Sequence, residues 1–186
     1  MSEKNRQFDP GARLFQALLS IERRAREREQ AIPAAVVEQK GWKGIAFTLG
    51  GVRVLTSMEE IRELLPYPDT ITTVPGSKEW LLGLANVRGE LLPIVDLQQF
   101  IGAAPVVLND QARVLVIRNL GMSTGLLVGS LQGMRYFSAD KRIPGAIFEG
   151  ALGKYVYDVF GLEDGVWPVF SMAALVHDER FMDVAA

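Results

Sequence analysis

The chain has 186 residues, of which 48% are apolar and 23% charged, and its formal net charge is −2. Such a composition is ordinary for a globular protein, and the charge excludes the strong basic excess of a typical nucleic-acid-binding protein. No apolar run approaches the roughly 18 residues of a membrane helix, and residues 1–13 lack the apolar core of a signal peptide. Cysteine is absent. We therefore expect a cytoplasmic protein.

Residues 1–41 are predicted to form an N-terminal helix followed by a linker. Asp9 and Pro10 supply a helix cap and a first-turn proline, and apolar residues then recur at helical spacing. This stripe consists of Leu14, Leu18, Ile21 and Ala25. Pro33 ends the pattern because proline is excluded from helix interiors. The stripe can pack against the rest of the chain or bind a partner, and the sequence leaves both readings open.

From Trp42 onward the apolar period changes to two, which indicates β-strands. Gly50-Gly51 lies between two such runs and predicts a tight hairpin turn, because positive φ is cheap for glycine. Several other pairs of short β-rich runs follow, with few helical patterns between them. This arrangement favours small barrels over a parallel sheet. We predict two barrels, at roughly 42–102 and 112–170.

Three shorter stretches lead to local predictions. Ser57 and Glu60 have the spacing of a capping box, which predicts a short helix over 57–65. Pro93 lies inside an apolar run but lacks an N–H donor, so we expect it at a sheet edge or a bulge. Residues 177–186 resemble the loosely ordered ends of many domains.

Groups that carry catalysis or bind metals are scarce. His177 is the single histidine, and the motifs of a nucleophile elbow and a phosphate-binding loop are both absent. We therefore expect no enzyme activity, no metal and no cofactor. One alternative is an enzyme that uses Asp96 and Glu90 as an acid–base pair in a barrel cleft, although Asp96 is also placed to cap a helix. A nucleic-acid-binding barrel is a second alternative, which the acidic balance after residue 40 disfavours.

Arg88 stands out because it is flanked by valine and glycine at the turn between two apolar strands. Its guanidinium can form paired hydrogen bonds to a carboxylate. That carboxylate can be internal, on Asp96 or Glu60, or it can belong to a binding partner. The three tryptophans also fit two readings, a core or an interface. They are Trp42, Trp80 and Trp167.

The stretch LLGLANVRGELLPIVDL, residues 81–97, resembles the signature of CheW-type coupling proteins. Three further stretches are similar to this family: GGVRVLTSMEEIREL to its first hairpin, VLVIRNLGMSTGLLVGSLQGM to its central strand pair, and VWPVFSMAAL to its closing strand and helix. Together they cover about residues 43–176. Within the family, the N-terminal extension, the GVWPVFS ending and the terminal RFMDVAA look most like the PilI-type adaptors of type IV pilus twitching-motility chemosensory systems.

The resemblance implies a mainly β fold, with two SH3-like five-stranded β-barrels sharing a hydrophobic core over residues 42–176, an added N-terminal helix and a C-terminal tail at 177–186. It also implies a turn and a strand in place of the helix over 57–65. The implied role is a non-catalytic adaptor that couples the cytoplasmic tip of a methyl-accepting chemoreceptor to the regulatory domain of a CheA-type histidine kinase. Such an adaptor joins membrane-bound receptor arrays through its partners. A flagellar chemotaxis coupling protein is the alternative within the family.

The resemblance also implies a set of partner-binding positions. Carried over by motif, Glu60, Gly83 and Arg88 fall on such positions, and Met58, Val87 and Gly89 adjoin them.

Overall fold

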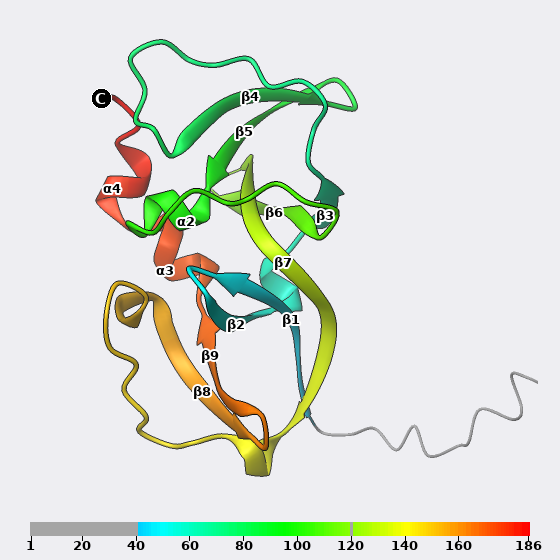
Figure 1. Ribbon diagram of the computed structural model, residues 1–186, viewed down its shortest axis with the longest axis vertical. Helices are drawn as coiled ribbons and strands as arrows, with labels where there is room; N and C mark the ends of the chain where they lie inside the picture. The colour runs from blue at the N-terminus through cyan, green and yellow to red at the C-terminus, as the bar shows by residue number, and fades with distance from the viewer. Residues whose placement is uncertain (1–40, 120) are drawn as a thin grey trace, which may run out of the picture. The chain divides into compact units, whose positions relative to one another are not determined.

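The structure, a computed structural model, describes residues 41–119 and 121–186 (Figure 1). The predicted N-terminal helix lies outside the described residues. The described strands are β1 (Gly41–Leu49), β2 (Val52–Ser57), β3 (Glu63–Pro66), β4 (Leu81–Val87), β5 (Glu90–Asp96), β6 (Ala112–Asn119), β7 (Met122–Ser138), β8 (Val156–Leu162) and β9 (Gly165–Phe170). The helices are α2 (Leu97–Phe100), α3 (Met172–Val176) and α4 (Glu179–Met182), and the 3-10 turns are η1 (Met58–Glu60), η2 (Ala139–Lys141) and η3 (Gly153–Tyr155).

Strand β7 is 17 residues long and belongs to two five-stranded sheets (Figure 1). Its first half pairs with β6 and β5, and its second half pairs with β1. We call β3–β6–β7–β5–β4 the first sheet and β7–β1–β2–β9–β8 the second sheet. The mainly β fold and its two five-stranded units are thus confirmed. Neither sheet closes into a full barrel, because among the described residues no ladder joins β3 to β4 or β7 to β8.

The strands of each sheet do not come from the consecutive segments 42–102 and 112–170 that the sequence predicted. Strands β1 and β2 lie in the second sheet with β8 and β9, whereas β6 lies in the first sheet with β3, β4 and β5. The cause is the length of β7, since a strand that runs through both sheets lets the chain cross from one to the other. Hairpin patterns along the sequence reveal neighbours but not such a crossover.

The apolar core of the described residues has three clusters. The largest draws buried residues from both sheets and from α2, α3 and α4, including Phe47, Leu115, Phe170 and Leu97. A second cluster belongs to the strands of the first sheet and a third to those of the second sheet. The predicted shared core therefore corresponds to the largest cluster. Trp167 is fully buried in the third cluster, and Trp42 and Trp80 are partly buried against the core clusters.

The region 57–65 follows the family expectation and not the local helix rule. Ser57 accepts a hydrogen bond from the Glu59 backbone N–H and caps η1, which ends after three residues. The chain then enters β3, where Leu64 pairs with Leu115 of β6. Pairing with a neighbouring strand has thus overridden a local helix signal. Pro93 also lies as expected, because it pairs with Leu84 of β4 and pairing with β7 begins only at Ile94.

The C-terminal residues 177–186 differ from the expectation of a loose end. Phe181 on α4 is 6% exposed. Its ring lies parallel to Trp80 at 6.2 Å between centroids and edge-on to Phe100 at 5.3 Å. Beyond α4 the chain forms a bridge between Ala185 and Ser77 in the loop before β4. Buried aromatic contacts thus hold a segment whose polar composition predicts disorder.

Asp178 anchors the start of this segment. Its carboxylate accepts hydrogen bonds from Lys154, the Tyr155 hydroxyl and Arg180, and only 9% of its side chain is exposed. The hydrogen bond from Arg180, with those from Lys154 and Tyr155, lowers the pKa of Asp178 below its ordinary value, although burial acts in the opposite direction. The charged carboxylate is therefore favoured in the folded state.

This pKa shift predicts a pH-dependent difference between the wild type and Asp178→Asn. A carboxyl whose pKa is lower when folded stabilises the protein above its unfolded pKa of about 3.9, and that contribution is lost as the pH falls toward the folded value. We expect the wild type to be more stable at pH 7, and the difference to shrink between about pH 4 and pH 2. Urea unfolding of both proteins at several pH values measures it. A difference that stays constant from pH 7 to pH 2 would contradict the role of Asp178.

Candidate partner-binding site

The turn between β4 and β5 holds Arg88 in a left-handed backbone conformation. Val87 pairs with Glu90, so the turn consists of Arg88 (φ 54°) and Gly89 (φ 86°). The Asn86 side-chain oxygen accepts a hydrogen bond from the Gly89 N–H at 2.9 Å. Two positive φ values identify a type I′ turn, which matches the twist of a hairpin. The sequence therefore fixes a tight, rigid tip.

Arginine is an unusual residue at the first position of such a turn. Among the described residues, Arg88 is the one non-glycine residue with positive φ. A left-handed conformation costs an L-residue about 1–2 kcal/mol, and asparagine or glycine occupies this position at less cost. Backbone strain of this kind is often associated with functional sites. We therefore take the Arg88 side chain as the starting point of the candidate site.

The Arg88 guanidinium pairs with Glu63 of β3, at 2.6 Å between Nη2 and Oε1. The internal carboxylate is thus neither Asp96 nor Glu60, as the sequence had suggested. The Arg88 side chain remains 75% exposed. An ion pair so open to solvent contributes only about 0.2–1 kcal/mol. Arg88 can therefore exchange Glu63 for a carboxylate on another molecule at little cost.

The alternative hypothesis of an acid–base pair formed by Asp96 and Glu90 is wrong, because the two residues lie at opposite ends of β5. Asp96 is 1% exposed and accepts hydrogen bonds from the backbone N–H groups of Gln98, Gln99 and Val106. It is therefore the N-cap of α2, as the sequence predicted. Glu90 is exposed, 3.8 Å from Arg62.

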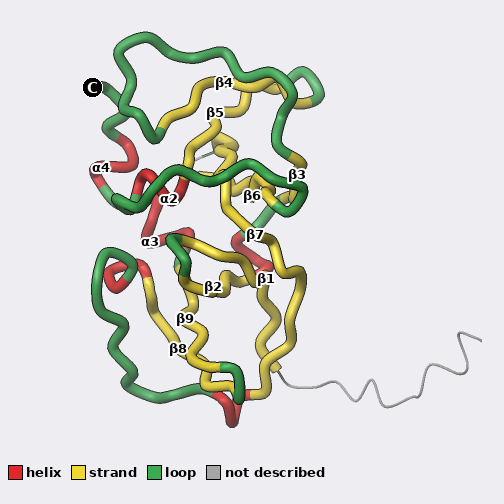
Figure 2. The backbone as a smooth tube through the Cα atoms, viewed as in Figure 1, coloured by secondary structure: helices red, strands yellow, loops and turns green. Residues whose placement is uncertain are grey.

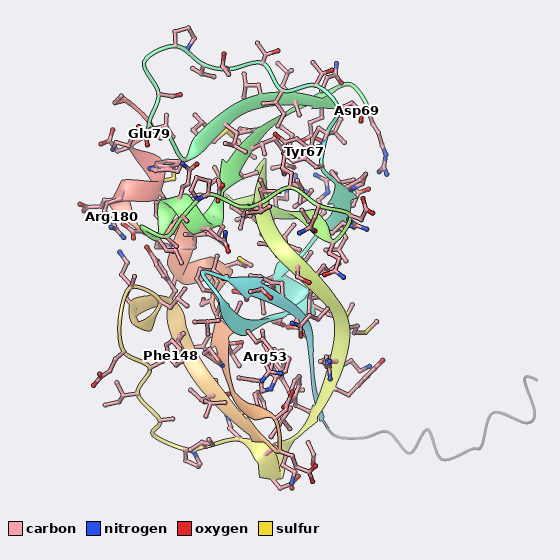
Figure 3. The ribbon with its side chains drawn as sticks, in the orientation of Figure 1. Arg53, Tyr67, Asp69, Glu79, Phe148 and Arg180 are labelled. Carbon is pink, nitrogen blue, oxygen red and sulfur yellow. The ribbon has the colours of Figure 1, made fainter. Side chains whose placement is uncertain are left out.

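A groove of about 720 Å³, which we call the hairpin groove, lies beside Arg88. One wall is the loop that follows β3, and the other is the β4–β5 hairpin. Figure 3 shows Tyr67 and Asp69 on the β3 side of the first sheet. Leu91 on the hairpin wall is 66% exposed. The lining residues are Leu65, Pro66, Pro68, Asp69, Thr70, Thr72, Leu84, Asn86, Val87, Arg88 and Leu91.

Gly83 lies under this loop and is buried. Its φ is +139°, and a Cβ atom built on it would lie 2.2 Å from the Thr72 carbonyl oxygen. Thr72 and Leu84 exchange two backbone hydrogen bonds at 2.8 Å beside it. Any side chain at Gly83 would thus push the loop away from β4. Packing of the loop on β4 therefore explains why position 83 is glycine, which the motif alone does not explain.

The other two predicted residues, Met58 and Glu60, lie on η1. Met58 is 37% exposed. Glu60 is used internally, since its carboxylate accepts hydrogen bonds from the Ala173 N–H at 3.0 Å and from the hydroxyls of Thr56 at 3.2 Å and Ser171 at 3.4 Å. Glu60 therefore ties η1 to the start of α3.

This tie shapes a second groove, of about 460 Å³, which we call the central groove. It is bounded by η1, by β6 of the first sheet and by α3, which follows the last strand of the second sheet. Apolar side chains of Ile61, Ile117, Met172 and Val176 line part of it. Its other lining residues are Glu59, Glu60, Arg62, Arg118, Ala173 and His177.

Strand β3 and the residue before it connect the two grooves. Arg62 lines the central groove and donates to the Ser123 hydroxyl at 2.7 Å, while Glu63, the next residue, holds Arg88. The six predicted positions thus gather at two adjoining places, η1 and the hairpin. Sequence reasoning missed Arg62 and Glu63. Both are charged residues that interrupt the apolar pattern before Leu64, and this interruption was the sequence signal that could have identified them.

The described part of the chain offers no group of three His, Cys, Asp or Glu side chains that could hold a metal ion. Within the same residues, no helix has the length and apolarity needed to cross a membrane.

Comparison with known proteins identifies the family to which this fold and this hairpin belong. The family model described as CheW-like domain matches residues 43–180. The protein PilI of Pseudomonas aeruginosa is 40% identical over 174 residues, which span 92% of this chain and 96% of that protein. The chemotaxis protein CheW of Bacillus subtilis is 25% identical over 88 residues, or 47% of this chain and 56% of that one.

A solved structure supports the fold independently. The crystal structure of the scaffolding protein TtCheW from Thermoanaerobacter tengcongensis superposes with a TM-score of 0.62 at 19% identity, covering 71% of this chain and 85% of that one. Three observations lead to one conclusion: the two linked five-stranded sheets, the hairpin that bears the signature, and a family model that matches most of the chain. The chain belongs to the CheW-like domain family.

Proposed function

We propose that this protein is a non-catalytic adaptor that couples a methyl-accepting chemoreceptor to a CheA-type histidine kinase, in a chemosensory system that controls type IV pilus twitching motility. The family assignment supports the coupling role, and the 40% identity to PilI over nearly its whole length supports the pilus system. A flagellar coupling protein is the alternative, supported by the weaker match to chemotaxis protein CheW. The adaptor would act in the cytoplasm, at receptor arrays that it joins through its partners.

The observation that carries this proposal is the exposed Arg88 on a strained hairpin tip beside an apolar groove. Arginine is enriched among residues that dominate protein–protein binding, especially beside apolar surface that excludes water. We assign the kinase regulatory domain to the hairpin groove. Exposed Leu91 and half-buried Val87 would be covered by the partner, and a partner carboxylate would replace Glu63 on Arg88.

We assign the receptor tip to the central groove. A receptor tip is a helical hairpin, and an amphipathic helix binds by laying its apolar face into an apolar groove. Half-buried Ile61 and Val176 offer such a face, with buried Ile117 behind them. Met58 is exposed on η1 and precedes the lining residue Glu59 in the chain. This assignment gives each of the two partners its own surface.

The first test replaces Arg88. We expect Arg88→Ala to weaken binding of the kinase regulatory domain about 30-fold, because a central arginine typically contributes at least about 2 kcal/mol. The melting temperature should change little, since only an exposed ion pair is lost. Isothermal titration with circular dichroism as the control measures both. Arg88→Lys retains the charge without the bidentate fork and should recover part of the affinity. Unchanged kinase binding by Arg88→Ala would remove Arg88 from the interface.

The second test places a charge at the central groove. Met58→Asp should reduce binding of the receptor tip at least tenfold, because an unpaired charge would be buried against an apolar helix face. Aspartate in the first turn of a helix is favourable, so the fold should tolerate the change. Kinase binding should stay unchanged. Met134→Asp, at an exposed methionine of the second sheet, is the matched control. Equal receptor binding by both variants would overturn the assignment of this groove.

A further inference from the structure

The loop between β3 and β4, residues 67–80, is long and has almost no regular structure, yet it is anchored at three places. Figure 2 shows it passing along β4 toward α4 and the C-terminus. Loops of this length in compact domains are usually functional or disordered. The backbone bonds between Thr72 and Leu84 form the first anchor, and the Trp80 carbonyl, which accepts from the Asp96 N–H at 2.8 Å, forms the second.

The third anchor is the chain's own C-terminal segment. The Lys78 N–H donates to the Val184 carbonyl at 3.0 Å, and the Ala186 N–H donates to the Gly76 carbonyl at 2.9 Å. The Lys78 ammonium also pairs with Asp183 at 2.8 Å. Residues 183–186 thus add to this loop as a short strand would, so that loop and tail hold each other.

The C-terminal segment is itself firmly held elsewhere. Phe181 packs against both Trp80 and Phe100, and Asp178 is bonded to Lys154 and Tyr155 of η3. Its contacts therefore reach from η3, through α2, to the loop. Because this segment contacts both the core and the loop, it can hold the loop in one position relative to the core.

The same loop forms the outer wall of the hairpin groove. Pro68, Asp69, Thr70 and Thr72 face the groove from the loop, opposite Arg88 and the hairpin. Gly83 lets this wall lie directly on β4, because Thr72 O occupies the space of a side chain. The wall is therefore held by β4 at Thr72, and the next stretch of the same loop, residues 76–78, is held by the C-terminal segment.

We propose that residues 178–186 act as an intramolecular strap that sets the position of loop 67–80, and thereby the width of the hairpin groove in which the kinase binds. The inference rests on the proposed function for the identity of the partner. The strap makes no contact with the kinase. It favours the loop conformation that forms the groove, so that binding does not have to order the loop.

The experiment deletes residues 183–186 from the full-length chain. Hydrogen exchange at the amides of residues 68–78 should become faster. If the binding-competent loop is then populated only about 10–20% of the time, kinase affinity falls about five- to tenfold, because apparent affinity scales with that fraction. Affinity for the receptor tip should stay within about twofold of the wild type. Val184→Thr, which retains the backbone pairing and the side-chain volume, is the matched control and should behave like the wild type.

The outcomes separate the strap from the proposed function. If the wild type binds no kinase, the proposed function fails. If the wild type binds and the deletion binds equally well, the strap is overturned, as it is if exchange in the loop does not change. If the deletion weakens binding of both partners equally, the strap is also overturned, because its effect is then not confined to the hairpin groove.

Discussion

Strand β7 is the constraint on which the rest of the described structure depends. One half of β7 pairs within each sheet, so a continuous backbone joins the two sheets. Contacts between side chains are not their only connection. The largest apolar cluster then packs where both sheets and the helices contribute. Since β5 pairs with β7, the hairpin that bears Arg88 is tied to this same strand. Surfaces carried by such a scaffold keep a fixed geometry, which suits a protein proposed to bridge two partners.

The polar residues around the grooves do different kinds of work. Arg88 is exposed, strained and weakly paired, as expected of a group that changes partner. Glu60 and Gly83 are structural in this fold: one ties η1 to α3, and the other lets a loop approach β4. Substitution of any of the three would impair binding, but by different routes. A sequence motif alone does not distinguish residues that bind a partner from residues that hold the fold, whereas their contacts in the structure do.

Much of the fold followed from the sequence, and the exceptions have physical causes. The Gly50-Gly51 and Arg88-Gly89 hairpins, the Asp96 cap and the edge position of Pro93 all arise from local rules. The helix predicted over 57–65 failed because Leu64 gains more from pairing with β6 than from a helical turn. The crossover at β7 and the order of residues 177–186 depend on contacts between distant segments. A polar tail that contains one aromatic residue, Phe181, gives little sign that this ring packs against both Trp80 and Phe100.

We propose that one scaffold presents two separate grooves, the hairpin groove for the kinase and the central groove for the receptor tip. The most direct test adds the kinase regulatory domain to the complex of the adaptor with the receptor tip, and follows the mass of the assembly by analytical ultracentrifugation. The account predicts a three-component complex, with each partner binding as tightly as it does alone. Displacement of the receptor tip by the kinase domain would mean that both use one surface, and would contradict it.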